Sequence, residues 1–210
     1  MINTEKTSLM KIDSSREKDT SAEHQLKIVK ELTILWIRIN CDATNVTDNN
    51  LQLKLPTIKS SIQQWKRRGL TPIGRICVLK TLLVSKLVHL FMTLPDPSTQ
   101  RIKELERLFF EFIWGQKNDK VKRTKMIQSY SKDGLNMLEL HSFIKSMKLS
   151  WLKRMWTSNA DWTIIARTEL PDIEKLLTYG CTKLEFIQTK LTNPFYLNIV
   201  QAWIHYNRVY

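Results

Sequence analysis

The stretch LQLKLPTIKSSIQQWKRRGLTPIGRICVLKTLLVSKLVHL, Leu51 to Leu90, decides the fold because it joins the strongest helical pattern of the chain to its strongest charge bias. It contains five Lys and three Arg and not one Asp or Glu. Charges of both signs usually alternate on a globular surface, so a run at +8 without an acid favours a polyanionic partner. A nucleic-acid backbone is the first candidate, and a helical protein-interaction module with a solvated basic surface is the alternative.

Local signals within this stretch predict two helices that meet at a corner. An apolar stripe at i, i+4 and i+7 predicts the first helix over Thr57–Arg68. Gly69 suits the left-handed residue that ends a helix, and Thr71 and Pro72 suit the N-cap and first position of the next one. The second helix, predicted over Ile73–Leu94, is apolar nearly all round, which is typical of a helix packed on several sides.

Further helices are predicted after this corner. Ser98 is placed to cap a third helix that Gly115 ends. A turn at Gly134-Leu135 then precedes a long amphipathic helix that reaches Trp156. Shorter helical segments are predicted at Ile164–Arg167, Pro171–Tyr179 and Phe195–Tyr206. The residues predicted to be largely buried between Leu51 and Trp114 are Trp65, Leu79, Leu83, Leu87, Leu105, Phe109 and Trp114.

Several motifs occur in an order that carries a resemblance to a known family. They are W-K-R-R-G-L-T-P-I-G-R-I-C-V-L-K-T-L-L-V-S-K-L (Trp65–Leu87), P-D-P (Pro95–Pro97), F-F-E-F-I-W-G (Phe109–Gly115), K-D-G-L (Lys132–Leu135) and K-L-S-W-L-K-R (Lys148–Arg154). Their sequence and spacing resemble the region that follows the polymerase core in non-LTR (LINE-type) retrotransposon reverse transcriptases. The resemblance covers roughly residues 1–156.

The resemblance implies a mainly α fold with short β elements at the N-terminal end, followed by a helical thumb bundle. Residues 1–50 correspond to the end of the palm, residues 51–116 to the thumb and residues 117–210 to a post-thumb helical region. Met1–Ile12 resembles the segment after the catalytic aspartates, which implies a position for Lys6 close to the incoming nucleotide; a short strand and turn with a solvated lysine is the alternative. The chain would then begin after the metal-binding carboxylates, and it contains no adjacent Asp pair. A truncated fragment without polymerase activity is therefore expected.

The N-terminal and connecting segments are predicted as follows. Thr33–Ile39 alternates as a strand does, and the resemblance implies here the hairpin that grips the primer end, with Leu35-Trp36 in place of the tight L-G turn. Ser14–His24 is expected to be an exposed loop and Cys41–Asn50 a turn-rich connection. The resemblance implies a short strand at Lys117–Lys125, for which a solvated charged loop is an equal alternative.

Thumb helices of this family hold the template–primer duplex by its backbone, so RNA or an RNA/DNA duplex is the expected partner. Such contacts position a duplex without reading its sequence. Lys80 and Lys86 interrupt an apolar helix. An alternative role for one of them is to lay its aliphatic stem along the core instead of contacting a phosphate. The candidate phosphate contacts are Lys59, Lys66, Arg67, Arg68, Arg75, Lys80, Lys86, Lys122, Arg123 and Lys125.

Composition bounds the other function classes. The chain has 210 residues, 42% hydrophobic residues, seven Trp and a formal net charge of +13, so a folded, basic protein is expected. The cysteines Cys41, Cys77 and Cys181 are odd in number and far apart, which favours a reducing compartment over a disulfide framework. Neither a membrane span, a metal-ligand cluster, a cofactor motif nor a small-molecule site is predicted. An intracellular, soluble protein is expected, with nucleus and cytoplasm equally open.

Overall fold

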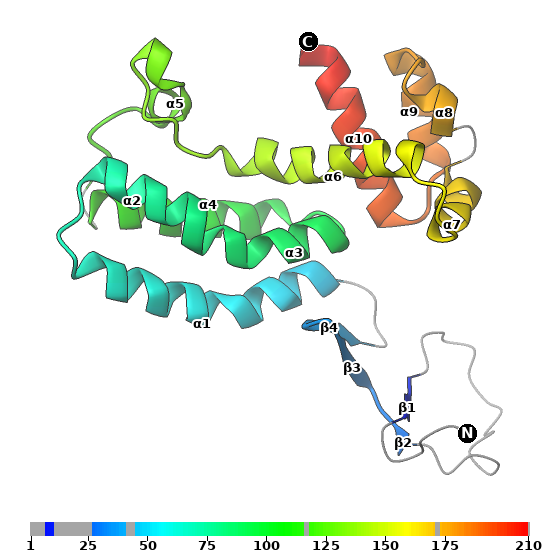
Figure 1. The fold of residues 1–210 in the computed structure, drawn as a ribbon, viewed down its shortest axis with the longest axis horizontal. Coiled ribbons are helices and arrows are strands. Elements are labelled where there is room, and N and C mark those ends of the chain that lie inside the picture. Colours follow the sequence, from blue (N-terminus) through cyan, green and yellow to red (C-terminus); the bar gives the residue numbers. More distant parts are fainter. Residues whose placement is uncertain (1–6, 11–26, 41–44, 116–117, 171–172, 210) are drawn as a thin grey trace.

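A computed structural model describes residues 7–10, 27–40, 45–115, 118–170 and 173–209. Figure 1 shows short strands at the N-terminal end followed by an array of helices, so the predicted mainly α fold is confirmed. The elements are β1 (Ser8–Leu9), β2 (Lys27–Ile28), β3 (Glu31–Ile34), β4 (Ile37–Asn40), α1 (Val46–Lys66), α2 (Pro72–Val78), the π-helical turn η1 (Leu79–Leu83), α3 (Ser85–Thr93), α4 (Thr99–Trp114), α5 (Arg123–Ile127), the 3-10 turn η2 (Tyr130–Lys132), α6 (Leu140–Thr157), α7 (Trp162–Glu169), α8 (Ile173–Leu176), α9 (Cys181–Lys190) and α10 (Pro194–Val209). Strands β1 and β2 pair in parallel, and β3 and β4 form an antiparallel hairpin.

The first helix is longer than predicted. The segment Val46–Asn50, expected to belong to a turn-rich connection, forms the first turn of α1, and the helix continues through Pro56. Leu51 and Leu55 are buried and extend the apolar stripe of α1 backwards from Ile58. Burial of Leu51 and Leu55 explains why α1 starts before Pro56, whereas the sequence prediction placed the start after this proline.

The corner between the first two helices is confirmed. Gly69 has a φ of 62°, the left-handed conformation that glycine adopts without a steric penalty. The Thr71 hydroxyl accepts a hydrogen bond from the Gly74 N–H at 3.2 Å, and Pro72 occupies the first position of α2. The helical path then runs to Thr93 through η1, with a bend of 47° between its two parts.

The third predicted helix is confirmed as α4. The Ser98 hydroxyl accepts a hydrogen bond from the Arg101 N–H at 3.2 Å, and Gly115 ends the helix with a φ of 66°. Together α1, α2, η1, α3 and α4 enclose the main hydrophobic core. All the residues predicted to be buried lie in this core except Trp65, which is only partly buried because it packs at the end of α1.

The predicted strand at Lys117–Lys125 is wrong for the described residues, because α5 begins at Arg123 and residues 118–122 form no strand. The loop after α5 folds back on itself, with the Met137 N–H donating to the Met126 carbonyl at 2.8 Å. Gly134 is required there, since a Cβ at this position would lie 2.0 Å from the Gln128 carbonyl oxygen. This contact gives the K-D-G-L motif a steric explanation.

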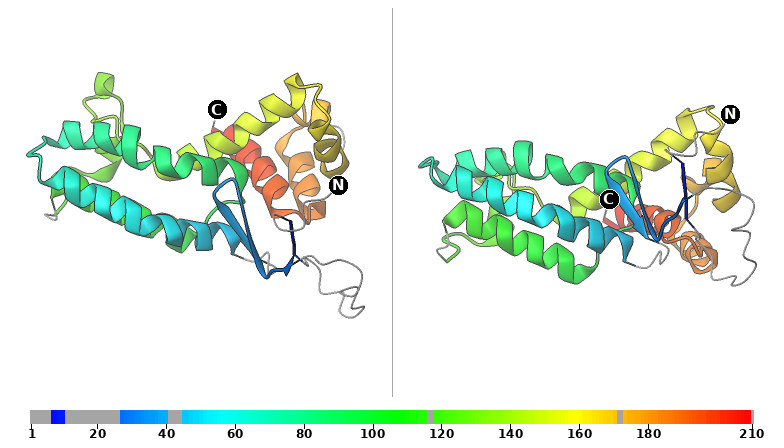
Figure 2. Two further views of the ribbon diagram at one scale, coloured as in Figure 1. Left: turned by 60° about the horizontal axis from the view of Figure 1, so that its bottom comes forward. Right: turned by 90° about the horizontal axis from the view of Figure 1, so that it is seen from below.

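Helix α6 joins two hydrophobic cores. Its first half contributes Leu140 and Ile144 to the main core, and its second half contributes Leu152 and Met155 to a second core with α7, α8, α9 and α10. Figures 1 and 2 show α6 extending from the bundle to the C-terminal helices. The main core therefore continues past residue 116, where the thumb region was expected to end.

The C-terminal helical segments are longer or differently placed than predicted. The segment Ile164–Arg167 lies within α7, and Phe195–Tyr206 lies within α10. Of Pro171–Tyr179, the helix α8 covers only Ile173–Leu176. Helix α9 was not predicted, since its apolar pattern is weak and only Leu184 among its residues is fully buried.

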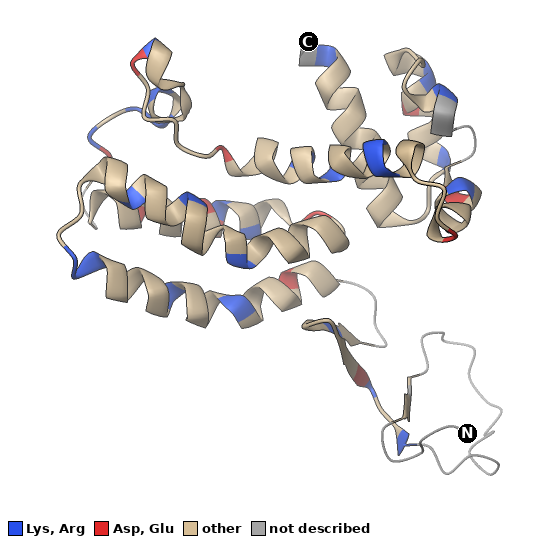
Figure 3. Cartoon of the chain, viewed as in Figure 1, with Lys and Arg blue, Asp and Glu red and all other residues tan. Residues whose placement is uncertain are grey.

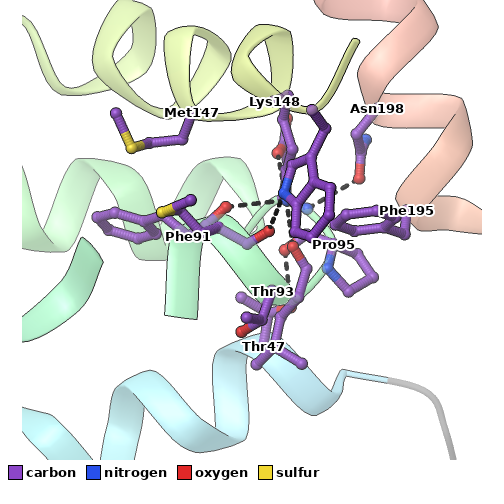
Figure 4. A network of polar contacts seen from close by, with 12 residues as sticks. Thr47, Phe91, Thr93, Pro95, Met147, Lys148, Phe195 and Asn198 are labelled. Atoms are coloured by element: carbon purple, nitrogen blue, oxygen red, sulfur yellow. Dashed lines mark hydrogen bonds and ion pairs between the residues drawn. The ribbon is translucent and has the colours of Figure 1, made fainter. Parts of the chain in front are cut away.

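The segment between α3 and α4 is a joint that ties three helices together (Figure 4). The Thr47 hydroxyl of α1 donates to the Pro95 carbonyl at 2.8 Å, and the Asp96 N–H donates to the Asn198 side chain of α10 at 2.8 Å. From α6, the Trp151 indole N–H donates to the Met92 carbonyl at 2.7 Å. The P-D-P motif thus lies where the bundle meets the C-terminal helices.

No single helix of the described chain has the length and apolar composition needed to cross a membrane. Only the bent pair Pro72–Leu83 and Ser85–Thr93 meets that criterion when taken together.

Candidate nucleic-acid interface

One side of the α1–α3 pair presents a row of basic side chains. Lys54 and Ser61 are seven residues apart, so they lie on one side of α1, and Arg68 lies in the turn that follows the helix. The ammonium of Lys86 in α3 donates to the Ser61 hydroxyl at 2.6 Å, which fixes that side as the one beside α3. Figure 3 shows several basic residues along α1, and Lys86 is the one Lys or Arg of α3. We call the surface formed by Lys54, Ser61, Arg68, Lys86 and His89 the α1–α3 face.

The α3 half of this face follows helical spacing as well. Lys86 and His89 lie at i and i+3 of α3, and both are exposed. On α3, the His89 ring contacts the Leu35 carbonyl of the β3–β4 hairpin at 3.1 Å. The α1–α3 face therefore runs from the end of α1 to the tip of the hairpin.

Three of the predicted phosphate contacts lie at the end of α1. Lys66 is its last helical residue, whereas Arg67 and Arg68 lie in the turn that follows. Arg68 lies over the Trp65 ring with its guanidinium 4.6 Å from the centroid. Lys59 and Lys66 are seven residues apart and share the opposite flank of α1, the flank away from Lys86. Lys54, which joins Arg68 on the α1–α3 face, was missing from the predicted set.

A second group of predicted basic residues gathers around the α5 loop. The Lys80 ammonium donates to the Asn136 carbonyl at 2.7 Å, and Lys125 donates to the Lys132 carbonyl at 2.6 Å. Arg123 pairs with Asp119 at 2.8 Å and lies 4.2 Å from the Phe110 ring centroid. Lys122 is exposed beside them. Figure 1 shows α5 separated from α1 by the layer of α2, α3 and α4, so this group is distinct from the α1–α3 face.

Arg75 has a structural role that its sequence pattern did not indicate. Its Nη1 donates to the carbonyls of Phe112 at 3.0 Å and Ile113 at 3.2 Å, which satisfies the C-terminal end of α4. A Cβ at Gly115 would lie 3.0 Å from the same nitrogen. The G-R and I-W-G motifs therefore meet, and Arg75 is held away from the solvent side of α2.

The tip of the β3–β4 hairpin exposes a large aromatic ring. Trp36 is 84% exposed and Leu35 is 75% exposed, although both are bulky apolar residues. Their φ angles are 66° and 49°, a left-handed conformation that costs non-glycine residues about 1 kcal/mol or more. The hairpin implied by the resemblance is present, and its turn carries Trp where a glycine would be unstrained.

The hairpin is held against α1 by the Asn50 side chain and by the packing of Ile37 and Ile39 on the main core. The Asn50 carboxamide accepts from the Arg38 N–H and donates to the Arg38 carbonyl, each at 2.8 Å. It also donates to the Val46 carbonyl at 2.8 Å. Asn50 thus positions the hairpin and its exposed tip at the end of the α1–α3 face.

Sequence inspection missed Lys148 as a buried cation. Its ammonium donates to the Phe91 carbonyl at 3.0 Å and to the Leu94 carbonyl, and its Nζ lies 3.7 Å from Asp96 Oδ1 (Figure 4). Burial lowers the Lys148 pKa to about 8, although the Asp96 carboxylate opposes the shift. Burial also raises the Asp96 pKa, against the opposing effect of Lys148. The position of Lys148 between Ile144 and Leu152 on an apolar stripe was the available signal.

Lys6 lies outside the described residues. Within the described parts of the chain, no group of three or more His, Cys, Asp or Glu residues is arranged to hold a metal ion. No protein-family model matches the chain.

Proposed function

We propose that this chain is a thumb-containing part of a LINE-type reverse transcriptase that binds the phosphate backbone of a template–primer duplex. The observation that carries the proposal is the α1–α3 face, which lies within an acid-free run of eight basic residues. Lys54 lies about two helical turns before Ser61, which Lys86 contacts, and Arg68 lies in the turn at the end of α1. Such a row suits the regularly spaced charges of one nucleic-acid strand.

The places where the resemblance motifs meet also support the proposal. Arg75 of the G-R motif contacts the F-F-E-F-I-W-G motif, and Lys148 of the K-L-S-W-L-K-R motif pairs with Asp96 of the P-D-P motif. Motifs that follow one another along the sequence are thus in contact across helices that pack together. The Arg75 contacts stabilise the bundle that presents the α1–α3 face.

The test is the salt dependence of duplex binding. Replacing Lys54, Arg68 and Lys86 by Gln should lower the magnitude of the log K against log[salt] slope by about 2 to 3 units, because each phosphate contact releases less than one counterion. Binding should weaken by the same factor for unrelated duplex sequences, since backbone contacts carry no base information. Fluorescence anisotropy with a blunt RNA/DNA duplex at several salt concentrations gives both quantities.

A matched triple variant separates this proposal from a solvated basic surface. Replacing Lys59, Lys66 and Lys103 by Gln removes the same charge from positions outside the α1–α3 face, and the slope should change by less than one unit. Equal slopes for both triple variants, measured on proteins with wild-type circular dichroism, would favour the interaction-module alternative instead.

A further inference from the structure

A hollow lies where α6 ends and α7 begins. Its volume is about 660 Å³, within the range of sites that hold a small organic group. The lining residues are Trp151, Arg154, Thr157, Ser158 and Trp162. Two indole rings, one guanidinium and two hydroxyls therefore share one concave surface, and no carboxylate lines it.

The aromatic part of the hollow is held in place from behind. The Trp151 and Trp162 rings meet edge to face with centroids 5.6 Å apart, and Trp151 meets Phe195 in the same manner at 5.7 Å. The Trp151 indole N–H is already bonded to the Met92 carbonyl, so this ring offers the hollow only its apolar surface. Trp162 is 38% exposed and remains accessible. A pre-positioned aromatic wall of this kind suits a flat, stacking ligand.

The polar part of the hollow favours an anion. The Arg154 guanidinium lies over Trp151 at 5.3 Å from the ring centroid, and no ion pair joins it to a carboxylate among the described residues. The Ser158 hydroxyl accepts from the Ala160 N–H at 3.2 Å and keeps its own proton for donation. No acidic residue occurs between Glu139 and Asp161, while Lys153 adds a further positive charge.

We propose that this hollow binds an unpaired nucleotide of a single-stranded RNA or DNA segment. The base stacks on the more exposed Trp162 ring and meets Trp151 with its edge, and Arg154 binds the adjacent phosphate, the combination by which proteins hold single strands. The site is separate from the α1–α3 face, and only the choice of a nucleic acid as ligand rests on the proposed function. It would give the protein a contact for a strand that extends beyond a duplex.

The test uses a single-stranded RNA of about ten nucleotides and a blunt duplex as separate probes. Trp162→Ala should weaken single-strand binding about 5- to 100-fold, the range expected for loss of one stacking contact, and should leave duplex binding unchanged. Trp162→Phe should restore most of the affinity. Trp156→Ala is the matched control, because Trp156 is a 58% exposed tryptophan of α6 that does not line the hollow.

A second measurement does not depend on a folded variant. A single strand carrying 5-iodouridine should crosslink on irradiation to the wild-type protein at Trp162 or Trp151, as mapped by mass spectrometry. Crosslinks confined to other residues, or equal effects of Trp162→Ala and Trp156→Ala, would overturn the proposal. A loss of the duplex salt effect with single-strand binding intact would contradict only the proposed duplex function.

Discussion

Lys148 shows how one buried side chain connects two parts of the molecule. Its ammonium bonds to carbonyls at the end of α3 and pairs with Asp96, while the chain of α6 carries it between the two hydrophobic cores. An ammonium removed from water is stable only where such partners are close. The proton of Lys148 is therefore held less tightly in the folded protein than in the unfolded chain.

This shift predicts a pH dependence of stability. Below pH 8 both the folded and unfolded chains carry the Lys148 proton, whereas between about 8 and the ordinary value of 10.5 only the unfolded chain keeps it. The free energy of unfolding should therefore rise with pH in that window, by about 1 kcal/mol at pH 9 relative to pH 7. Urea denaturation at both pH values measures the difference.

The variant Lys148→Met should abolish most of this rise, because it removes the titrating group while keeping much of the side-chain volume. Lys153→Met, at an exposed position of the same helix, should retain it. A rise of equal size in Lys148→Met would show that another group causes the pH dependence.

The β3–β4 hairpin is an element whose turn conflicts with its sequence. Two-residue hairpin loops with both φ angles positive favour Asn-Gly, whereas this chain places Leu35 and Trp36 there. The hydrogen bonds from Asn50 hold the hairpin to α1 and so maintain the strained turn. A cost in stability at an exposed aromatic tip is typical of a position kept for binding.

Replacing Leu35-Trp36 by Asn-Gly should stabilise the hairpin by about 1 kcal/mol, because neither new residue is strained at these φ angles. Native-state hydrogen exchange of the Arg38 amide, which donates to Asn50, should slow by roughly fivefold. The same variant should weaken duplex binding if the exposed ring contacts the ligand. Faster exchange would mean that Leu35 and Trp36 contribute contacts to the hairpin that outweigh the strain.

In the whole molecule, the bundle and the C-terminal helices share α6 and the joint around Asp96. The α1–α3 face belongs to the bundle, whereas the aromatic hollow belongs to the far end of α6, so the two proposed contacts lie in different parts of one framework. Binding by several phosphates and one stacked base needs no catalytic group from either part.

The purified chain should accordingly show no templated DNA synthesis on an RNA or DNA primer–template with Mg²⁺ or Mn²⁺. Two-metal nucleotidyl transfer needs carboxylate ligands of the kind that an adjacent Asp pair supplies in the polymerases this chain resembles, and the sequence has no such pair. Primer extension followed on a denaturing gel is the measurement. Products that survive repurification and vanish when nucleotides are omitted would contradict the binding-only proposal.

The sequence by itself determined the features that depend on near neighbours in the chain. The left-handed Gly69, the Thr71 and Ser98 caps and the end at Gly115 follow from local backbone sterics and hydrogen bonding, and each was predictable. The acid-free basic run was equally visible, because charge is a property of composition. The start of α1 was not predicted, since the packing of Leu51 and Leu55 into the tertiary core outweighs the local signal of Pro56.

Only the tertiary structure decided which basic residues act together. Helical periodicity places Lys54 and Lys59 on different flanks of α1, and the packing of α3 then brings Lys86 to Ser61, on the flank of Lys54. Arg75 caps a helix end and Lys148 is buried because other helices bring carbonyl groups to them. The physical reason is that a cation's role depends on the groups that surround it, and those groups come from distant parts of the chain.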